Sequence, residues 1–246
     1  MPMPETAVRE RPIHFPTDAQ VRAVLEGRKT EHRMLVKPQP KWEVTRVAQA
    51  FSAGVSPPML GGQWVFQYSV GQLRVCCPVG LRGDRLWLRE AFALRWPEGV
   101  DSPWISDPAA PGGERPVTSR DCVPVYRATF DGDEYDRPWD EARDRPLPWQ
   151  NPLHMPRWAS RLTLEITEVR VERLQEISEE GARAEGISTS VVDPQPRGVA
   201  PIYPKQYLTA RDCFRDLWDA AHARRGFGWD ANPWVWTVGF RRMEDA

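Results

Sequence analysis

The sequence lacks the short motifs that mark the common classes of enzyme. It has no Gly-x-x-x-x-Gly-Lys-Ser/Thr phosphate loop, no Gly-x-Gly-x-x-Gly after a strand, no His-Glu-x-x-His and no Gly-x-Ser-x-Gly. The four histidines are scattered along the chain, at positions 14, 32, 154 and 222. These absences argue against a P-loop nucleotide hydrolase, a dinucleotide-binding fold, a zinc protease and a serine hydrolase.

Cysteine is also scarce: the chain has four, Cys76, Cys77, Cys122 and Cys213. An adjacent pair with two distant single residues matches no zinc spacing and is too sparse for a disulfide framework. We therefore expect reduced thiols in a cytoplasmic protein, without a metal and without a cofactor. No apolar run of about 20 residues occurs, so we expect a soluble protein with no signal peptide and no membrane partner.

An excess of positive charge is missing as well. The 33 Lys and Arg residues nearly balance the 34 Asp and Glu residues, so the net charge is −1. A nucleic-acid partner would therefore need a local basic patch. Residues 22–46 offer one, with seven cations against three acids. The alternative is an ordinary solvated face.

Proline and tryptophan are abundant instead, at 25 and 12 residues. Frequent proline predicts long irregular connections, and we expect insertions near 95–121 and 188–206. Tryptophans serve either as core anchors or as platforms on which nucleic-acid bases stack.

Periodicity and turn residues predict the order of the main elements. Thr17 and Gly27 bracket a helix over 18–26, and Ser178 begins one over 178–187. The remaining elements are strands starting near 35–36 and over 63–68, 72–75, 85–90, 123–128, 162–174 and 234–241, with a helix over 207–224. Because no regular βαβ repeat appears, we expect an α+β fold, a small curled antiparallel sheet or barrel with attached helices. Residues 1–12 read as a loose lead-in and 13–246 as a single domain.

Two carboxylates stand in positions that require explanation. Glu90 shares a strand face with Leu86 and Leu88, so it is either paired, for example with an arginine, or functional. Glu185 falls in the last turn of its helix, where the helix dipole disfavours a negative charge. It therefore needs a nearby cation or a role in a site.

The segment 154–161 interleaves a histidine, two arginines and a tryptophan before a long strand. Arg157 and Trp158 have the composition of a site that combines base stacking with phosphate contact. The alternative is a tryptophan that plugs the core beneath arginine side chains.

Several motifs, in order, resemble the ASCH domain family of the PUA-like superfamily, in its larger phage- and prophage-encoded branch. They are Gly-Arg-Lys-Thr at 27–30, Gly-Asp-Arg-Leu-Trp-Leu-Arg-Glu at 83–90, His-Met-Pro-Arg-Trp-Ala-Ser-Arg at 154–161, Ile-Ser-Glu-Glu-Gly-Ala-Arg-Ala-Glu-Gly at 177–186, and Trp-Asp-x-Asn-Pro-Trp-Val-Trp at 229–236. The motif blocks span residues 13–241. The resemblance implies a PUA-like β-barrel with flanking helices and long Pro-rich insertions. It also implies a cleft that accepts nucleic acid or one modified base.

The same resemblance implies candidate catalytic residues. Small bacterial relatives hydrolyse N4-acylated cytidine with a lysine, a threonine three residues later and a downstream glutamate. The lysine corresponds to Lys29 and the glutamate to Glu185, while His32 stands at the position of the threonine. His32 is then the candidate proton carrier in its place, and Thr30 lies nearby.

Three functions follow as hypotheses. The first is binding of RNA, DNA or a modified nucleotide through a cationic cleft around Lys29. The second is hydrolysis of an N4-acylated cytosine or cytidine, with Lys29 as base and Glu185 as proton shuttle. The third is ribonuclease activity. The expected binding residues are Arg28, Thr30, Arg33, Trp87, Glu90, Arg157 and Trp158.

Overall fold

The structure is a computed structural model of the 246-residue chain. It describes residues 8–50, 63–69, 71–96, 104–110, 112–131, 139–140, 145–187 and 207–243. The expected insertion at 188–206 lies outside the described residues. The chain forms two compact units. The first contains Met1–Ile13, Ala23–Trp87 and Leu162–Ala246, and the second contains His14–Arg22 and Leu88–Arg161.

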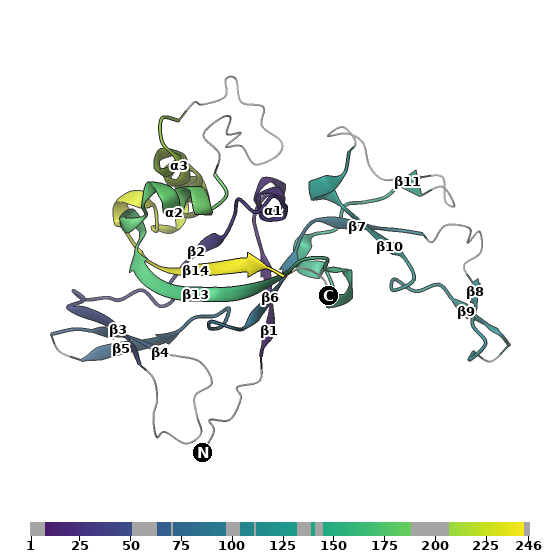
Figure 1. The fold of residues 1–246 in the computed structure, drawn as a ribbon, viewed down its shortest axis with the longest axis horizontal. Coiled ribbons are helices and arrows are strands. Elements are labelled where there is room, and N and C mark those ends of the chain that lie inside the picture. Colours follow the sequence, from purple (N-terminus) through teal and green to yellow (C-terminus); the bar gives the residue numbers. More distant parts are fainter. Residues whose placement is uncertain are drawn as a thin grey trace, which may run out of the picture. The chain divides into compact units, whose positions relative to one another are not determined.

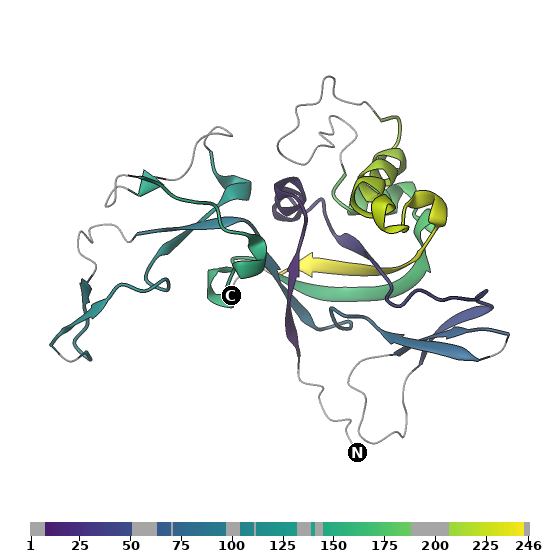
Figure 2. The ribbon, with the colours of Figure 1, turned by 180° about the vertical axis from the view of Figure 1, so that it is seen from behind.

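A five-stranded sheet is the main element of the first unit, and its strand order is β1-β6-β13-β14-β2 (Figure 1). The β6–β13, β13–β14 and β14–β2 pairs are antiparallel. The two long strands β13 and β14 run side by side, and Figure 2 shows the same pair from behind. The bounds of the five strands are Glu10–His14, Arg85–Arg89, Thr163–Arg173, Trp234–Arg242 and Glu31–Leu35.

The first unit also carries a three-stranded sheet on one side of β14. Its strands are β3 (Arg46–Ala50), β4 (Gln63–Gln67) and β5 (Gln72–Cys76). Phe66 packs edge-on against Trp234, and Trp64 packs in the same way against Trp236. The alternating tryptophans of β14 therefore hold this sheet.

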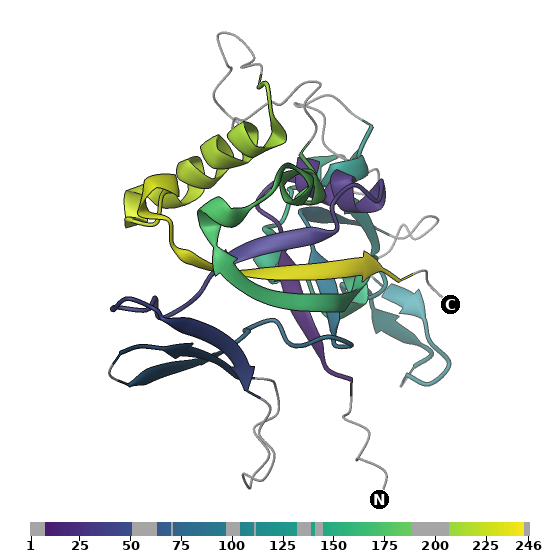
Figure 3. The ribbon, with the colours of Figure 1, turned by 60° about the vertical axis from the view of Figure 1, so that its left-hand side comes forward.

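Helices lie on the other side of β14 (Figure 3). They are α2 (Glu179–Ala184) and α3 (Ala210–His222), and together with α1 (Asp18–Leu25) they are the α-helices of the described residues. Val235, one residue along from Trp234, is buried in one cluster with Leu174, Ala182 and Phe214. Successive β14 residues thus face different layers, and both layers exclude water.

Short antiparallel pairs make up the second unit. They are β7 (Phe92–Arg95) with β10 (Val123–Tyr126), β8 (Trp104–Ser106) with β9 (Glu114–Pro116), and β11 (Trp139–Asp140) with β12 (Arg145–Pro146). Single 3-10 turns add to both units, at Arg127–Thr129, Pro152–His154, Arg157–Ala159, Leu174–Glu176, Ala223–Arg225 and Trp229–Ala231.

The α+β class predicted from the sequence is confirmed. In the described part of the chain, the hydrogen-bonded strands form open sheets. Several predicted bounds are wrong. The strand predicted over 123–128 is β10, which ends at Tyr126. The strand expected near 35–36 is β2, which ends at Leu35 rather than beginning there. The helix expected from 207 begins at Ala210, because Thr209 is its N-cap and accepts a hydrogen bond from the Asp212 amide.

Candidate functional site

The turn after α1 places Lys29 against the end of α2. Gly27 has a φ of +73°, the left-handed conformation that ends many helices. The Lys29 amide donates to the carbonyl of Ala23, and the next amide, of Thr30, donates to the carbonyl of Ala184. Lys29 and Glu185 therefore face each other as an isolated antiparallel bridge.

Gly186 makes this approach possible from the other side. It follows Glu185 with a φ of +88°, and a Cβ at this position would lie 2.7 Å from Cβ of Ala23 and 3.0 Å from Cβ of Lys29. A larger residue would both strain the backbone and push the two segments apart. The N-cap at Ser178, predicted from the sequence, accepts from the Gly181 amide and fixes the start of the same helix.

The two side chains form a buried ion pair. Lys29 Nζ lies 2.5 Å from Glu185 Oε2, and it also donates to the carbonyls of Glu185 (3.1 Å) and Glu31 (2.8 Å). The exposed fraction is 0% for the Lys29 side chain and 4% for that of Glu185. Three acceptors satisfy the three ammonium protons, which is the arrangement that a buried charge requires.

Two more residues of β2 reach Glu185. His32 Nδ1 lies 3.7 Å from Oε2, and Arg33 Nη1 lies 3.4 Å from Oε1. Arg33 is itself buried, at 5% exposure. Glu185 therefore stands among a lysine, an arginine and a histidine, which answers the question of how a carboxylate at a helix C-terminus is compensated.

Burial and charge act in opposite directions on this pair. Burial alone would raise the pKa of Glu185, but Lys29, His32 and Arg33 outweigh it and hold that pKa well below its usual range. Burial lowers the pKa of Lys29, Arg33 adds to the effect, and Glu185 opposes it. The carboxylate is thus ionised at neutral pH, and the ammonium gives up its proton more easily than an exposed lysine does.

A network of ionised side chains continues from Arg33 across one face of the sheet. Arg33 Nη2 lies 2.8 Å from Glu172 Oε1, which also accepts from the hydroxyl of Thr237 at 2.6 Å. Arg33 Nη1 lies 3.1 Å from Glu31, which pairs with Arg170 at 2.9 Å. The pairing register of the three strands brings these side chains together, because Thr237 on β14 stands opposite both Arg33 on β2 and Arg170 on β13.

The other predicted residues of the first unit lie outside the buried cluster. Arg28 is exposed, pairs with Glu26 and donates to the carbonyl of Gly186 at 2.8 Å. Thr30 is exposed, and its carbonyl accepts from the Phe240 amide. Trp87 is 8% exposed and belongs to the core of the sheet.

Three predicted binding residues belong to the second unit. Glu90 is buried and forms a two-pronged pair with Arg161, whose Nε and Nη2 each lie 2.9 Å from a carboxylate oxygen. The sequence prediction that Glu90 is paired is confirmed. Burial raises the pKa of Glu90, and Arg161 opposes the shift. Arg157 and Trp158 lie on an exposed 3-10 turn, where the Trp158 side chain is 38% exposed.

The buried cluster combines the groups needed for proton transfer. Lys29 Nζ donates a hydrogen bond to Glu185 Oε2 over 2.5 Å, and His32 Nδ1 lies 3.7 Å from the same carboxylate oxygen. The described residues hold no group of three or more His, Cys, Asp or Glu placed to bind a metal ion.

Among the helices that the structure describes, none is long and apolar enough to cross a membrane. No protein-family model, no curated protein and no solved structure matches the chain.

Proposed function

We propose that the first unit is an ASCH-type, PUA-like domain that recognises a modified pyrimidine and hydrolyses its N-acyl amide at the Lys29–Glu185 pair. The observation that carries the proposal is the contact of 2.5 Å between Lys29 Nζ and Glu185 Oε2, with His32 at 3.7 Å.

The chemistry needs one water molecule and one proton relay. In its neutral form, which burial favours by lowering the pKa of Lys29, the Lys29 amine takes a proton from water, and the hydroxide attacks the acyl carbon. The carbon–nitrogen bond then breaks, and the relayed proton goes to the departing amine nitrogen. His32 supplies a further proton-carrying position next to Glu185. The products are a carboxylic acid and the free amino base, so atoms and charge balance.

Turnover of N4-acetylcytidine tests the proposal. We expect the protein to release cytidine, and we expect the Lys29→Met variant to lose at least 100-fold in rate. N4-methylcytidine is the matched control, because it has no acyl carbon and should remain intact. Absence of cytidine from the acetylated substrate, with a folded protein, would refute the hydrolase proposal.

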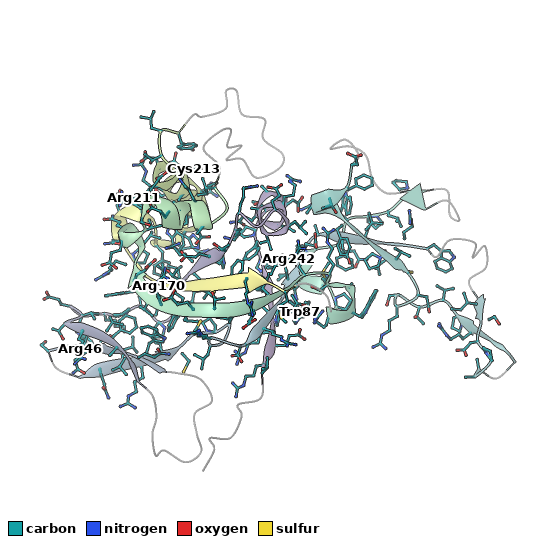
Figure 4. The ribbon with its side chains drawn as sticks, in the orientation of Figure 1. Arg46, Trp87, Arg170, Arg211, Cys213 and Arg242 are labelled. Atoms are coloured by element: carbon teal, nitrogen blue, oxygen red, sulfur yellow. The ribbon has the colours of Figure 1, made fainter. Side chains whose placement is uncertain are left out.

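Nucleic-acid binding is the second candidate, and a different surface supports it. On the three-stranded sheet, Arg46, Gln67, Gln72 and Arg74 share the face opposite the buried Phe66. These four side chains are exposed, and the strand residues of that face include no carboxylate. Arg46 is labelled on this sheet in Figure 4.

An exposed aromatic side chain, that of Trp42, lies next to the end of strand β4 in the first unit. Trp42 is 67% exposed and meets Tyr68 edge-on, with ring centroids 5.3 Å apart. Its open ring surface suits stacking by a base. Trp42 is not among the binding residues predicted from the sequence, although it lies within the basic stretch 22–46.

Binding to single-stranded RNA and DNA at several salt concentrations tests this candidate. We expect affinity to fall with salt, and the Arg46→Gln/Arg74→Gln variant to reduce that salt slope by about 2. Trp42→Ala should weaken binding without changing the slope. Binding that neither variant alters would exclude this surface.

A further inference from the structure

Glu172 on β13 is a close partner of Arg33, and the proposed reaction gives it no role. Its Oε1 atom accepts a hydrogen bond from Arg33 Nε at 3.0 Å and lies 2.8 Å from Arg33 Nη2. The same oxygen accepts a hydrogen bond of 2.6 Å from the hydroxyl of Thr237, whose side chain is completely buried on β14. Residues of two neighbouring strands therefore fix this carboxylate.

Arg33 connects Glu172 to the buried ion pair. Arg33 Nη1 lies 3.4 Å from Glu185 Oε1, while Lys29 Nζ lies 2.5 Å from the other oxygen, Oε2. The two oxygens of Glu185 are thus divided between two cations. Because a guanidinium is a rigid planar fork, its position decides how the Glu185 carboxylate is turned.

The guanidinium has little room to move. A Cβ at Gly181 would lie 3.0 Å from Arg33 Nη2, and the Gly181 carbonyl accepts from Nη1 at 3.4 Å. Among the described residues, the carboxylates that face the guanidinium are Glu31 at 3.1 Å, Glu172 at 2.8 Å and Glu185 at 3.4 Å. The contact with Glu172 is the shortest of the three.

Arg170, labelled in Figure 4, stands on the far side of these carboxylates. It lies 2.9 Å from Glu31 and 3.9 Å from Glu172. Arg33 is nevertheless shared among three carboxylates, and loss of one of them leaves more of its positive charge acting on the other two.

The charge of Arg33 also acts on the lysine. Burial lowers the pKa of Lys29, Glu185 opposes this effect, and Arg33 lowers the pKa further. A carboxylate that offsets the charge of Arg33 therefore favours the Lys29 ammonium. Glu172 is placed to do so through Arg33, since the Lys29 ammonium already donates to Glu185 and to the Glu31 carbonyl.

We propose that Glu172 is a positioning residue of the Lys29–Glu185 pair and that it acts through Arg33. Held by Thr237, Glu172 keeps the guanidinium at Oε1 of Glu185, which leaves Oε2 to Lys29, and it offsets part of the guanidinium charge. The inference rests on the proposed function, because it names a residue that orients the same site.

Titration of Lys29 by NMR tests the inference without a substrate. Selective ¹³C labelling of lysine gives few signals, because the chain has four lysines, and the Lys29→Met variant identifies the signal of Lys29. We expect Glu172→Gln to lower the pKa of Lys29, because an uncharged amide leaves more of the Arg33 charge acting on the pair. A substitution that merely loosened the site and admitted water would raise this pKa instead, since burial is the largest cause of its depression.

Two further variants complete the titration. Glu172→Asp keeps the charge but shortens the side chain, so the pKa of Lys29 should lie between those in the wild type and in Glu172→Gln. Glu168→Gln is the matched control, because Glu168 lies on the same strand, is 54% exposed and pairs with Arg170. It removes the same charge and should leave the titration of Lys29 unchanged.

The pH dependence of cytidine release from N4-acetylcytidine extends the test to the reaction. In Glu172→Gln we expect the plateau rate to fall about tenfold, because Glu185 is less well oriented. The acid limb of the profile should move to lower pH together with the titration of Lys29.

The outcomes separate the inference from the proposed function. A pKa of Lys29 that is unchanged or raised in both Glu172 variants, or lowered equally in Glu168→Gln, would overturn the inference. The expected titration shift in a protein that releases no cytidine would support the inference, and only the proposed reaction would then fail.

Discussion

Lys29 and Glu185 are 156 residues apart in the sequence, and their side chains meet at 2.5 Å in a site without exposed surface on the lysine. Their meeting depends on backbone conformation as much as on charge. Gly27 turns the chain after α1, Gly186 turns it after α2, and both have positive φ angles. The pair is therefore part of the architecture of the first unit as well as its candidate reacting centre.

Removing one member of the pair should lower the free energy of unfolding more than removing both members does. A buried ion pair adds little net stability, but a single buried charge without its partner is costly. We expect Lys29→Met to lower the free energy of unfolding by about 3 kcal/mol. Lys29→Met/Glu185→Leu should recover most of that loss, and chemical denaturation of the three proteins measures the difference.

The exposed pair of Arg241 and Glu165 is the control for this cycle. The Arg241 side chain is 70% exposed, so Arg241→Gln should change the free energy of unfolding by less than about 1 kcal/mol. If the double variant were less stable than Lys29→Met, the pair would contribute net stability, contrary to this prediction.

Acid should remove the contribution of Glu185 to stability. The folded protein holds the pKa of Glu185 below its ordinary value, so the unfolded chain binds the proton more readily. The contribution is complete above the unfolded pKa, about 4.3, and is lost as the pH falls through that value toward the folded pKa. We expect the stability difference between the wild type and Glu185→Gln to shrink between pH 5 and pH 3. A difference that stays constant or grows over this range would show that Glu185 is not held ionised.

The two glycines at the site should differ in their tolerance of a methyl group. Gly27→Ala strains a left-handed backbone but meets no atom within 4 Å, so we expect a loss of about 1–2 kcal/mol. Gly186→Ala adds the close contact with Ala23 and Lys29 and should cost clearly more in a thermal or denaturant unfolding measurement. Equal losses would mean that the two segments separate freely, which contradicts a tightly held pair.

Short-range signals explain which parts of the fold could be predicted from the sequence. Thr17 and Ser178 were predictable as caps because their hydrogen bonds reach only three residues along the chain. The position of Gly27 after a helix indicated its turn in the same way. The start of strand β2 was misplaced because its residues Glu31, His32 and Arg33 are polar. A strand whose charges are paired inside the protein has no apolar alternation to detect.

The site was only partly predictable for a related reason. Lys29 and Glu185 were identified through the resemblance and through the unfavourable position of a carboxylate at a helix end. Arg170, Glu172 and Thr237 were missed, since they alternate with apolar residues and resemble an ordinary solvent face. The register across β2, β14 and β13 brings them together, and no single stretch of sequence records that register.

The proposed hydrolysis requires the buried pair to carry protons, and the rate of cytidine release by Glu185→Gln measures this requirement. Glutamine keeps the size of the side chain but cannot carry a proton between water and the leaving amine. With N4-acetylcytidine at saturating concentration, we predict a loss of at least 100-fold in Glu185→Gln and an unchanged rate in Arg241→Gln. A Glu185→Gln protein that releases cytidine at the wild-type rate would contradict the account.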